Sequence, residues 1–360
     1  MKHILLVTLV CFLGLNVALG QQSGAQTLRL AQSIYEQGRL HELPDLLTKS
    51  GNNFTKTEQV QAYRLLTLAY IYLEEPEKAD ETMLKLLNTD HFFEPNKDVE
   101  PAEFIGLYKT FRTKPVFNIG LKFGANGTMP LLSSLYYVSS AAPGNGKYTT
   151  GVGIQFGLVF EKEIFNKWKN KIFGNGQLMF APEVLYTNRT FTYSNSRYSS
   201  SDSIPSKSEV SFQATIKQTW VDINPIVQLK LTTSKTFIPY VGFGPGISYL
   251  LNAPNTLVFT RAGGQGVVSG PDVLFTSSFN KIVPSVIGLA GLKYRFGAIY
   301  LIAEFRVQYG LTNPVNSSTR TNPDGTFNYN FVLSNYKPLT MMANIGFVLP
   351  YFNPIKLKRK

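Results

Sequence analysis

Charged side chains recur at alternate positions along apolar stretches in the second half of the chain. Glu304 and Arg306, for example, flank a single phenylalanine. Carboxylates and cations arranged in this way can form ion pairs or relay protons, and an unpaired charge inside a protein is costly. We expect a closed ion-pair network with a structural role, rather than a proton relay, formed by Lys122, Glu161, Glu183, Asp222, Lys230, Lys293, Arg295, Glu304 and Arg306.

Histidine usage argues against hydrolytic catalysis in this half. His3, His41 and His91 all precede residue 115, whereas a serine hydrolase needs an imidazole beside its hydroxyl. Asp202 and Glu209 lie in a serine-rich stretch that is typical of a solvated loop. We therefore predict that the protein is not an enzyme.

Metal and cofactor sites are also not expected. No histidine or carboxylate cluster has ligand spacing, and the single cysteine, Cys11, lies within the first twenty residues. These residues, 1–20, combine Lys2, an apolar run and a small-residue end, as in a secretory signal peptide. No later segment offers about 18 uninterrupted apolar residues, so a membrane-spanning form of this chain would have to be a barrel.

Residues 21–114 show the periodicity of a helical domain. The expected helices are 23–37, 40–49, 57–73, 76–88 and 101–111. The spacing of packing residues in the third and fourth resembles one tetratricopeptide repeat over residues 61–94, and a generic helical bundle is the alternative. The packing residues are Tyr63, Leu66, Tyr70, Ala79 and Met83.

From residue 115 onward the period changes from helical to alternating. This part holds 23 of the lysines and arginines but only 9 of the acidic residues, so it carries the basicity of the chain. Eight strands are expected, over 116–125, 150–162, 177–187, 219–231, 237–249, 283–296, 299–311 and 339–351.

The connections alternate in length, which favours an outer-membrane barrel over a soluble sandwich. Residues 232–236 and 297–298 are tight turns, whereas the long loops cover 126–149, 188–218, 250–282 and 312–338. The predicted fold is α+β, with an N-terminal helical hairpin domain followed by an eight-stranded antiparallel transmembrane barrel. Residues such as Val152 and Phe243 would face lipid, and the interior of such a barrel is too narrow for a channel.

Three segments of the second half carry a family resemblance. Residues 117–124, 221–230 and 239–248 are similar to strands of the PorT-like outer-membrane barrel family of Bacteroidota, and the resemblance covers about residues 115–352. It implies a barrel in the outer membrane of a Gram-negative bacterium and no catalytic residues. Some members are similar to components of type IX secretion.

Two functions remain open from the sequence. The first is a non-enzymatic outer-membrane protein, contacting lipid through residues 115–352, whose periplasmic domain 21–114 docks a protein partner in a secretion or surface-assembly system. The second is an adhesive, surface-binding barrel that acts through its long loops. Residues 353–360 read as a solvated basic tail, and nucleic acid is not an expected partner because the basic residues belong to an exported barrel.

Overall fold

A computed structural model describes most of the chain, and its contacts divide it into two compact units. The described residues are 24–136, 146–170, 174–198, 210–232, 234, 236–260, 267–323 and 331–357. The signal peptide predicted at 1–20 and the pair Asp202 and Glu209 lie outside these ranges. One unit comprises residues up to Val116 together with Phe352–Lys360, and the other comprises Phe117–Tyr351.

The first unit is helical. Residues 24–36 are helical, and the helices after them are η1 (Leu40–Glu42), α2 (Leu43–Lys49), η2 (Gly51–Asn53), α3 (Lys56–Tyr72), α4 (Pro76–Thr89) and α5 (Ala102–Tyr108). Thr55 and Glu58 form a capping box that fixes the start of α3. None of the helices among the described residues combines the length and the hydropathy needed to cross a membrane.

The helix α3 is the centre of the helical unit because two apolar clusters meet on it. Leu66 and Ala69 pack toward the first helices of the chain, while Leu68 packs against α4 and α5. Of the five packing residues predicted for the hairpin, Leu66, Ala79 and Met83 are buried. Tyr63 and Tyr70 are half-buried against the first cluster.

Residues 352–357 are part of the helical unit, which corrects the described part of the solvated tail expected at 353–360. Lys356 forms an isolated antiparallel bridge with Phe111 and an ion pair with Asp80. The backbone N–H of Leu357 donates to the carbonyl of Thr110 at 2.8 Å. The sequence did not indicate this pairing because the two segments lie about 240 residues apart.

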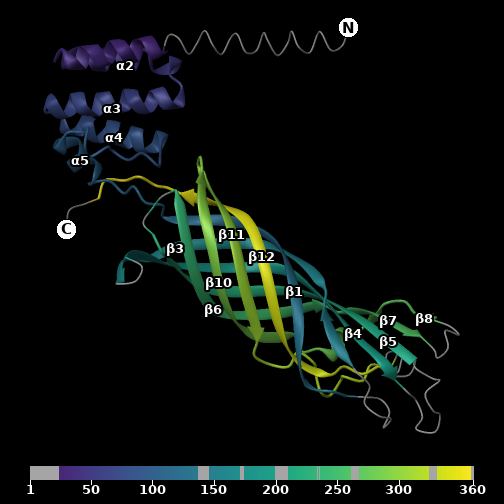
Figure 1. Cartoon of the computed structure of the whole chain (residues 1–360). Coiled ribbons are helices and arrows are strands. Elements are labelled where there is room, and N and C mark those ends of the chain that lie inside the picture. The colour runs from purple at the N-terminus through teal and green to yellow at the C-terminus, as the bar shows by residue number, and fades with distance from the viewer. Residues whose placement is uncertain are drawn as a thin grey trace, which may run out of the picture. The chain divides into compact units, whose positions relative to one another are not determined.

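The second unit is a closed antiparallel barrel of eight strands, as predicted. Around the ring the order is β4-β3-β1-β12-β11-β10-β6-β5, and pairing of β5 with β4 closes it (Figure 1). The strands are β1 (Phe117–Ser134), β3 (Val152–Asn170), β4 (Gly174–Tyr198), β5 (Val210–Lys230), β6 (Phe237–Asn252), β10 (Ile282–Phe296), β11 (Ile299–Gly310) and β12 (Asn335–Tyr351).

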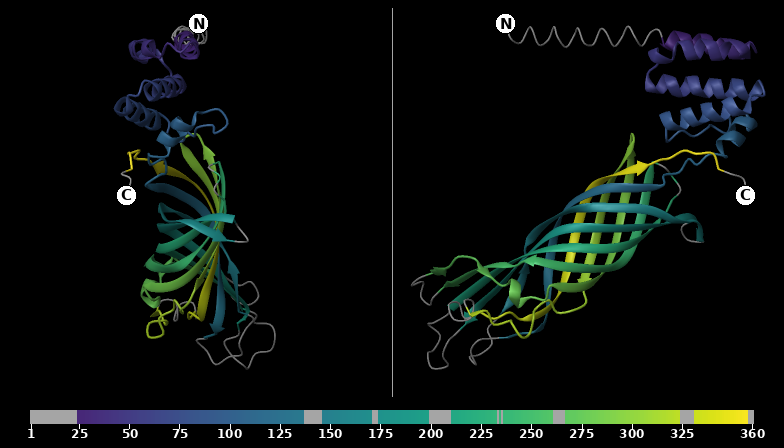
Figure 2. Two further views of the ribbon diagram at one scale, coloured as in Figure 1. Left: turned by 90° about the vertical axis from the view of Figure 1, so that its left-hand side faces the viewer. Right: turned by 180° about the vertical axis from the view of Figure 1, so that it is seen from behind.

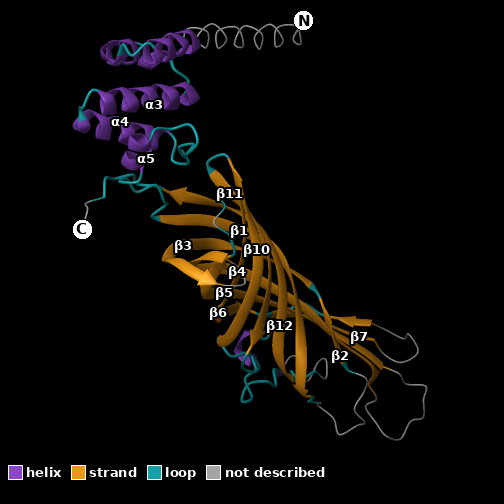
Figure 3. Ribbon diagram, turned by 60° about the vertical axis from the view of Figure 1, so that its left-hand side comes forward, coloured by secondary structure: helices purple, strands orange, loops and turns teal. Residues whose placement is uncertain are grey.

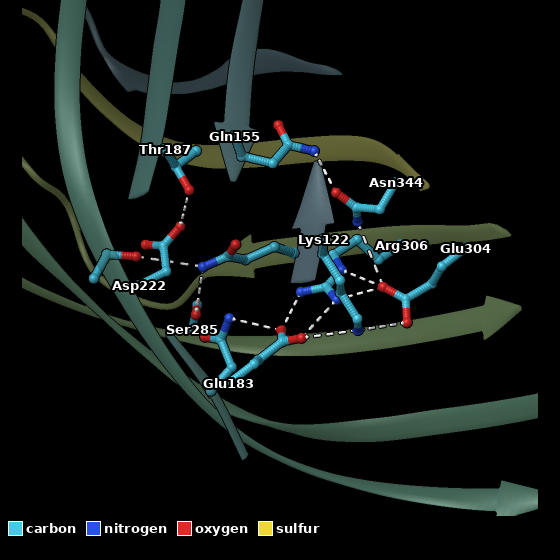
Figure 4. Close-up of polar contacts among 12 residues, drawn as sticks. Lys122, Gln155, Glu183, Thr187, Asp222, Ser285, Glu304, Arg306 and Asn344 are labelled. Atoms are coloured by element: carbon cyan, nitrogen blue, oxygen red, sulfur yellow. Dashed lines mark hydrogen bonds and ion pairs between the residues drawn. The ribbon is translucent and has the colours of Figure 1, made fainter. Parts of the chain in front are cut away.

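The alternation of the sequence fixes which face of each strand points outward. On β3 the side chains of Val152, Ile154, Phe156, Leu158 and Phe160 are all exposed. The polar residues between apolar positions, such as those shown in Figure 4, are buried inside the ring. The sandwich alternative, in which the apolar face forms the core, is therefore excluded.

The long-loop end of the barrel extends further than predicted. Most of the segment 188–218, expected to be a loop, belongs to β4 and β5, which pair from Gln177↔Lys230 to Tyr198↔Val210. Short strands extend this sheet, namely β2 (Lys147–Thr150), β7 (Pro254–Thr260), β8 (Val267–Ser269) and β9 (Val273–Leu274). The extension is visible beyond the ring in Figure 2. Its threonine-rich outer face has high β-propensity but lacks the apolar signal used to find strands.

The polarity of the two faces reverses along β4. Up to Tyr186 the outward residues are apolar, whereas Asn188, Thr190 and Thr192 are outward and polar. The inward positions, which are mixed up to Arg189, become aromatic at Phe191 and Tyr193, and these two join an apolar cluster inside this end. Loop residues, including Phe275 beside the short helix η4 (Thr276–Ser278), complete the cluster. Figure 3 shows the loops at this end of the barrel in teal. The barrel interior thus holds buried charges among apolar side chains in its main part and an apolar cluster at its mouth.

Several inward glycines allow the strands to coil tightly, and Gly157 shows the effect most directly. A Cβ at Gly157 would lie 2.0 Å from the carbonyl oxygen of Val184 on β4. We expect Gly157→Ala to lower the free energy of unfolding by about 1–3 kcal/mol, because the strands must separate. Urea unfolding in lipid vesicles measures this change. The matched control is Gly288→Ala, where the new Cβ meets nothing within 4 Å, and equal losses in both variants would contradict the prediction.

Candidate functional site: the charged interior of the barrel

Two carboxylates and two cations meet at the centre of the barrel. Lys122 on β1 places its Nζ 3.0 Å from Oε2 of Glu183 and 3.0 Å from Oε2 of Glu304. Arg306 on β11 binds the same two carboxylates, and its Nη2 donates to Oε2 of Glu183 at 2.9 Å (Figure 4). Because all four side chains are buried, each charge depends on the others for compensation.

Neutral side chains satisfy the remaining acceptor positions of this cluster. The hydroxyl of Tyr240 donates to Oε2 of Glu304 at 2.9 Å. The amide of Asn224 donates to Oε1 of Glu183 at 3.1 Å. A carboxylate held by two cations and a neutral donor is fixed in position, so this centre is built as a rigid structural element.

A second ion pair lies nearer the short-turn rim. Nζ of Lys293 on β10 is 2.5 Å from Oε1 of Glu161 on β3. Asn118 donates to the other oxygen of this carboxylate at 3.0 Å, and the Lys293 ammonium lies 4.9 Å from the centre of the Tyr240 ring. Tyr240 therefore connects this pair to the central cluster.

A third pair, toward the mouth, includes a residue that the sequence interpretation missed. Nη2 of Arg189 lies 2.8 Å from both carboxylate oxygens of Asp222, and the hydroxyl of Thr187 donates to the same carboxylate at 2.8 Å. The guanidinium also lies over the Trp220 ring at 5.3 Å. Arg189 was assigned to a loop, although its position two residues after Thr187 continues the inward alternation.

The buried charges balance once Arg189 is included. Within the described part of the barrel, the buried cations are Lys122, Arg189, Lys293 and Arg306, and the buried carboxylates are Glu161, Glu183, Asp222 and Glu304. Lys230 and Arg295, which were also expected in the network, are only half-buried. An interior with balanced charges that are fixed by hydrogen bonds can fill the barrel at low electrostatic cost.

Groups that could bind a metal ion are not found among the described residues, where no three histidine, cysteine or acidic side chains are suitably placed. His41 and His91 belong to the helical unit. The Nδ1–H of His91 donates a hydrogen bond to the carbonyl of Leu87 at 2.8 Å. Neither histidine is part of the barrel interior.

The helical unit contains a separate pocket of about 180 Å³ between α2, α3 and α4. Phe54, Tyr63 and Tyr70 supply aromatic surface, and Lys85 lies at its edge. The hydrogen bond from Lys85 to Glu81, 2.7 Å long, raises the pKa of the lysine. The pocket therefore combines aromatic and charged groups.

Comparisons with known proteins give matches only at the level of solved structures. No family model and no curated protein matches the chain. Similar structures include Neisserial surface protein A (13% identity, 65% of this chain and 97% of that chain, TM-score 0.28). OprG of Pseudomonas aeruginosa is also similar, with 13% identity over 67% of this chain and 98% of that chain and a TM-score of 0.28. Ail of Yersinia pestis has 12% identity over 65% of this chain and 99% of that chain, with a TM-score of 0.25. Similarity at this level assigns neither a family nor a function to the chain.

Proposed function

We propose that the protein is a non-enzymatic outer-membrane barrel whose helical unit docks a protein partner in the periplasm, within a secretion or surface-assembly system. The observation that carries the proposal is the apolar outer face of the closed ring. Phe243 and Ile345 are 70% and 68% exposed on separate strands, and large apolar patches of this kind need a membrane or a partner to cover them.

The direction of insertion follows from the strand connections. The short turns and both strand ends, Phe117 and Tyr351, belong to one rim, and the long loops belong to the other. Short turns of outer-membrane barrels normally face the periplasm. The helical unit, which is continuous with both strand ends, is then periplasmic.

The balanced interior gives no support to transport or catalysis as the role of the barrel. The chemistry available for recognition lies instead in the helical unit, where the pocket between α2, α3 and α4 combines aromatic and charged groups. The resemblance of residues 61–94 to a tetratricopeptide repeat and of residues 115–352 to PorT-like barrels supports a partner in an envelope machine.

Site-specific photocrosslinking in the native host tests this function. A photoreactive residue replacing Tyr70, which lines the pocket, is expected to form a protein adduct in intact cells. The matched control is Tyr72, on the same helix but outside the pocket and 47% exposed. Equal labelling at both positions, or no adduct at Tyr70, would contradict a partner at this surface.

An adhesive barrel is the second candidate, and the long β4–β5 hairpin favours it. We call the apolar outer face of the ring, which includes Phe243 and Ile345, the apolar belt. Beyond this belt the hairpin presents a polar outer face that includes Thr192 and Thr215, whose hydroxyls lie 3.3 Å apart. Shortening β4 and β5 at their paired ends while keeping the helical unit separates the two functions. Loss of surface attachment with the crosslink at Tyr70 retained would favour this second role.

A further inference from the structure

The outer edge of the apolar belt carries a regular alternation of cations and aromatic rings on five consecutive strands. In ring order from β5 through β6, β10 and β11 to β12, the residues at or just beyond this edge are Lys217, Tyr249, Lys281, Tyr309 and Lys337. Lys281 directly precedes β10. Neighbouring strands are separated by about 4.8 Å, so the lysines stand on alternate strands, roughly 10 Å apart across the sheet.

The register places these side chains where the surface changes from apolar to polar. Lys217 lies two outward positions beyond Val221, the first apolar residue on the outward face of β5, and pairs with Thr190. Lys337 pairs with Leu131, which is still an exposed apolar residue. The Lys337 ammonium lies 5.9 Å from the centre of the Tyr309 ring. A lysine at this level can lay its carbon chain along the apolar surface and keep its charge at the interface.

Among the residues that the structure describes, no acidic side chain is paired with Lys217 or Lys281. On the helical unit, Lys78 and Lys85 pair with glutamates one turn away at 2.7 Å. Lys217 and Lys281, by contrast, form no ion pair with any part of the chain that the structure describes. The described acidic residues of the barrel are the four buried ones together with Glu163, on the short-turn side, and Asp272, in a loop beyond the edge.

The arrangement is confined to one arc of the ring. On the opposite arc, β1, β3 and β4 present Leu131, Val152 and Thr190 near the same edge. If these lysines served only solubility, there would be no reason for them to lie on one arc of the ring at the edge of the apolar surface. Unpaired cations at a lipid interface attract phosphate groups, and adjacent tyrosines stabilise the headgroup region.

We propose that Lys217, Lys281 and Lys337 bind the phosphate groups of an anionic lipid in the outer leaflet, with Tyr249 and Tyr309 between them at the headgroup level. The inference rests on the proposed insertion of the barrel into the outer membrane. It adds a specific lipid contact on the arc from β5 to β12. Each lysine near a charged membrane surface contributes about fivefold to affinity, so the three together contribute about 100-fold.

The test uses the mature full-length chain reconstituted in phosphatidylcholine vesicles containing a minor fraction of diphosphoryl lipid A. After flotation and detergent extraction, native mass spectrometry measures the lipid A retained by each barrel. The wild-type chain is expected to retain lipid A, and K217Q/K281Q/K337Q is expected to bind it about 100-fold more weakly. The matched control K56Q/K97Q/K109Q, which removes the same charge from exposed sites on the helical unit, should retain it fully.

Two results would overturn the inference. They are equal retention by the two triple variants, and no preference of the wild-type chain for lipid A over phosphatidylcholine. Flotation separates this failure from failure of the proposed function. A chain that floats with the vesicles but shows no lipid preference retains its membrane insertion, whereas a chain that does not float loses both proposals.

Discussion

The Arg306→Met variant is expected to have a free energy of unfolding about 3–5 kcal/mol below that of the parent chain. Arg306 is fully buried and binds both Glu183 and Glu304. Its removal leaves these two carboxylates with Lys122 as their shared cation. The loss therefore arises mainly from an uncompensated buried charge. Equilibrium urea unfolding of the barrel in lipid vesicles measures the change.

Two further variants make this prediction specific. Arg306→Lys keeps the charge but not the forked donor geometry, and an intermediate loss is expected. Lys147→Met removes a cation from an exposed position on β2, where a change within about 0.5 kcal/mol is expected. The Arg306→Met barrel should also remain non-conducting in planar bilayers, because its interior is still filled. Stable single-channel currents, or a loss no larger than that of Lys147→Met, would contradict this view of the interior.

Removal of residues 352–360 is expected to destabilise the helical unit by about 2–4 kcal/mol through loss of hydrogen bonds and ring contacts. The Phe352 ring stacks on His91 with centroids 5.1 Å apart. Arg112 donates to the carbonyls of Asn353 and Ile355 at 2.6 to 2.9 Å. All of these contacts lie within one compact unit.

Limited proteolysis of the vesicle-reconstituted protein measures this destabilisation through the rate of cleavage within residues 24–112. A chain that ends at Leu357 is the control, because it keeps the bridge between Lys356 and Phe111 and lacks only the last three residues. The truncated chain should be cleaved faster, and the control should match the full chain. Equal cleavage rates for the chain ending at Tyr351 and the full chain would show that the segment contributes nothing.

The sequence predicts the barrel well where one period holds along a whole strand. The residues from Val152 to Phe160 alternate without exception, so both the strand and its outward face follow from the pattern. The same reasoning fails at Arg189, because the apolar residues exchange faces just beyond Thr187 and the outward positions become threonine and asparagine. A rule that searches for apolar alternation on one face stops at this exchange, although the backbone continues as a strand.

Pairings between segments far apart in the chain are the second feature of the fold that sequence periodicity does not predict. The expected helix boundaries agree closely with the observed ones, because capping and helix-breaking residues such as Thr55 and Pro76 act within one turn of the helix end. The contact between Phe111 and Lys356 depends on two short segments with no periodicity of their own. Their pairing is decided by what the completed barrel brings together, since Phe117 and Tyr351 are register partners at the start and end of the ring.

The C-terminal position of residues 352–360, which belong to the helical unit, sets an order of events during biogenesis. The helices are synthesised first, yet the residues after Tyr351 that complete their unit are synthesised last. At ordinary translation rates, the interval needed to make the barrel between them is roughly 10–50 s. During that time the N-terminal helices lack a native part of their unit. A bulky fusion at the C-terminus would prolong this immature state, whereas a tag placed before residue 24 would not.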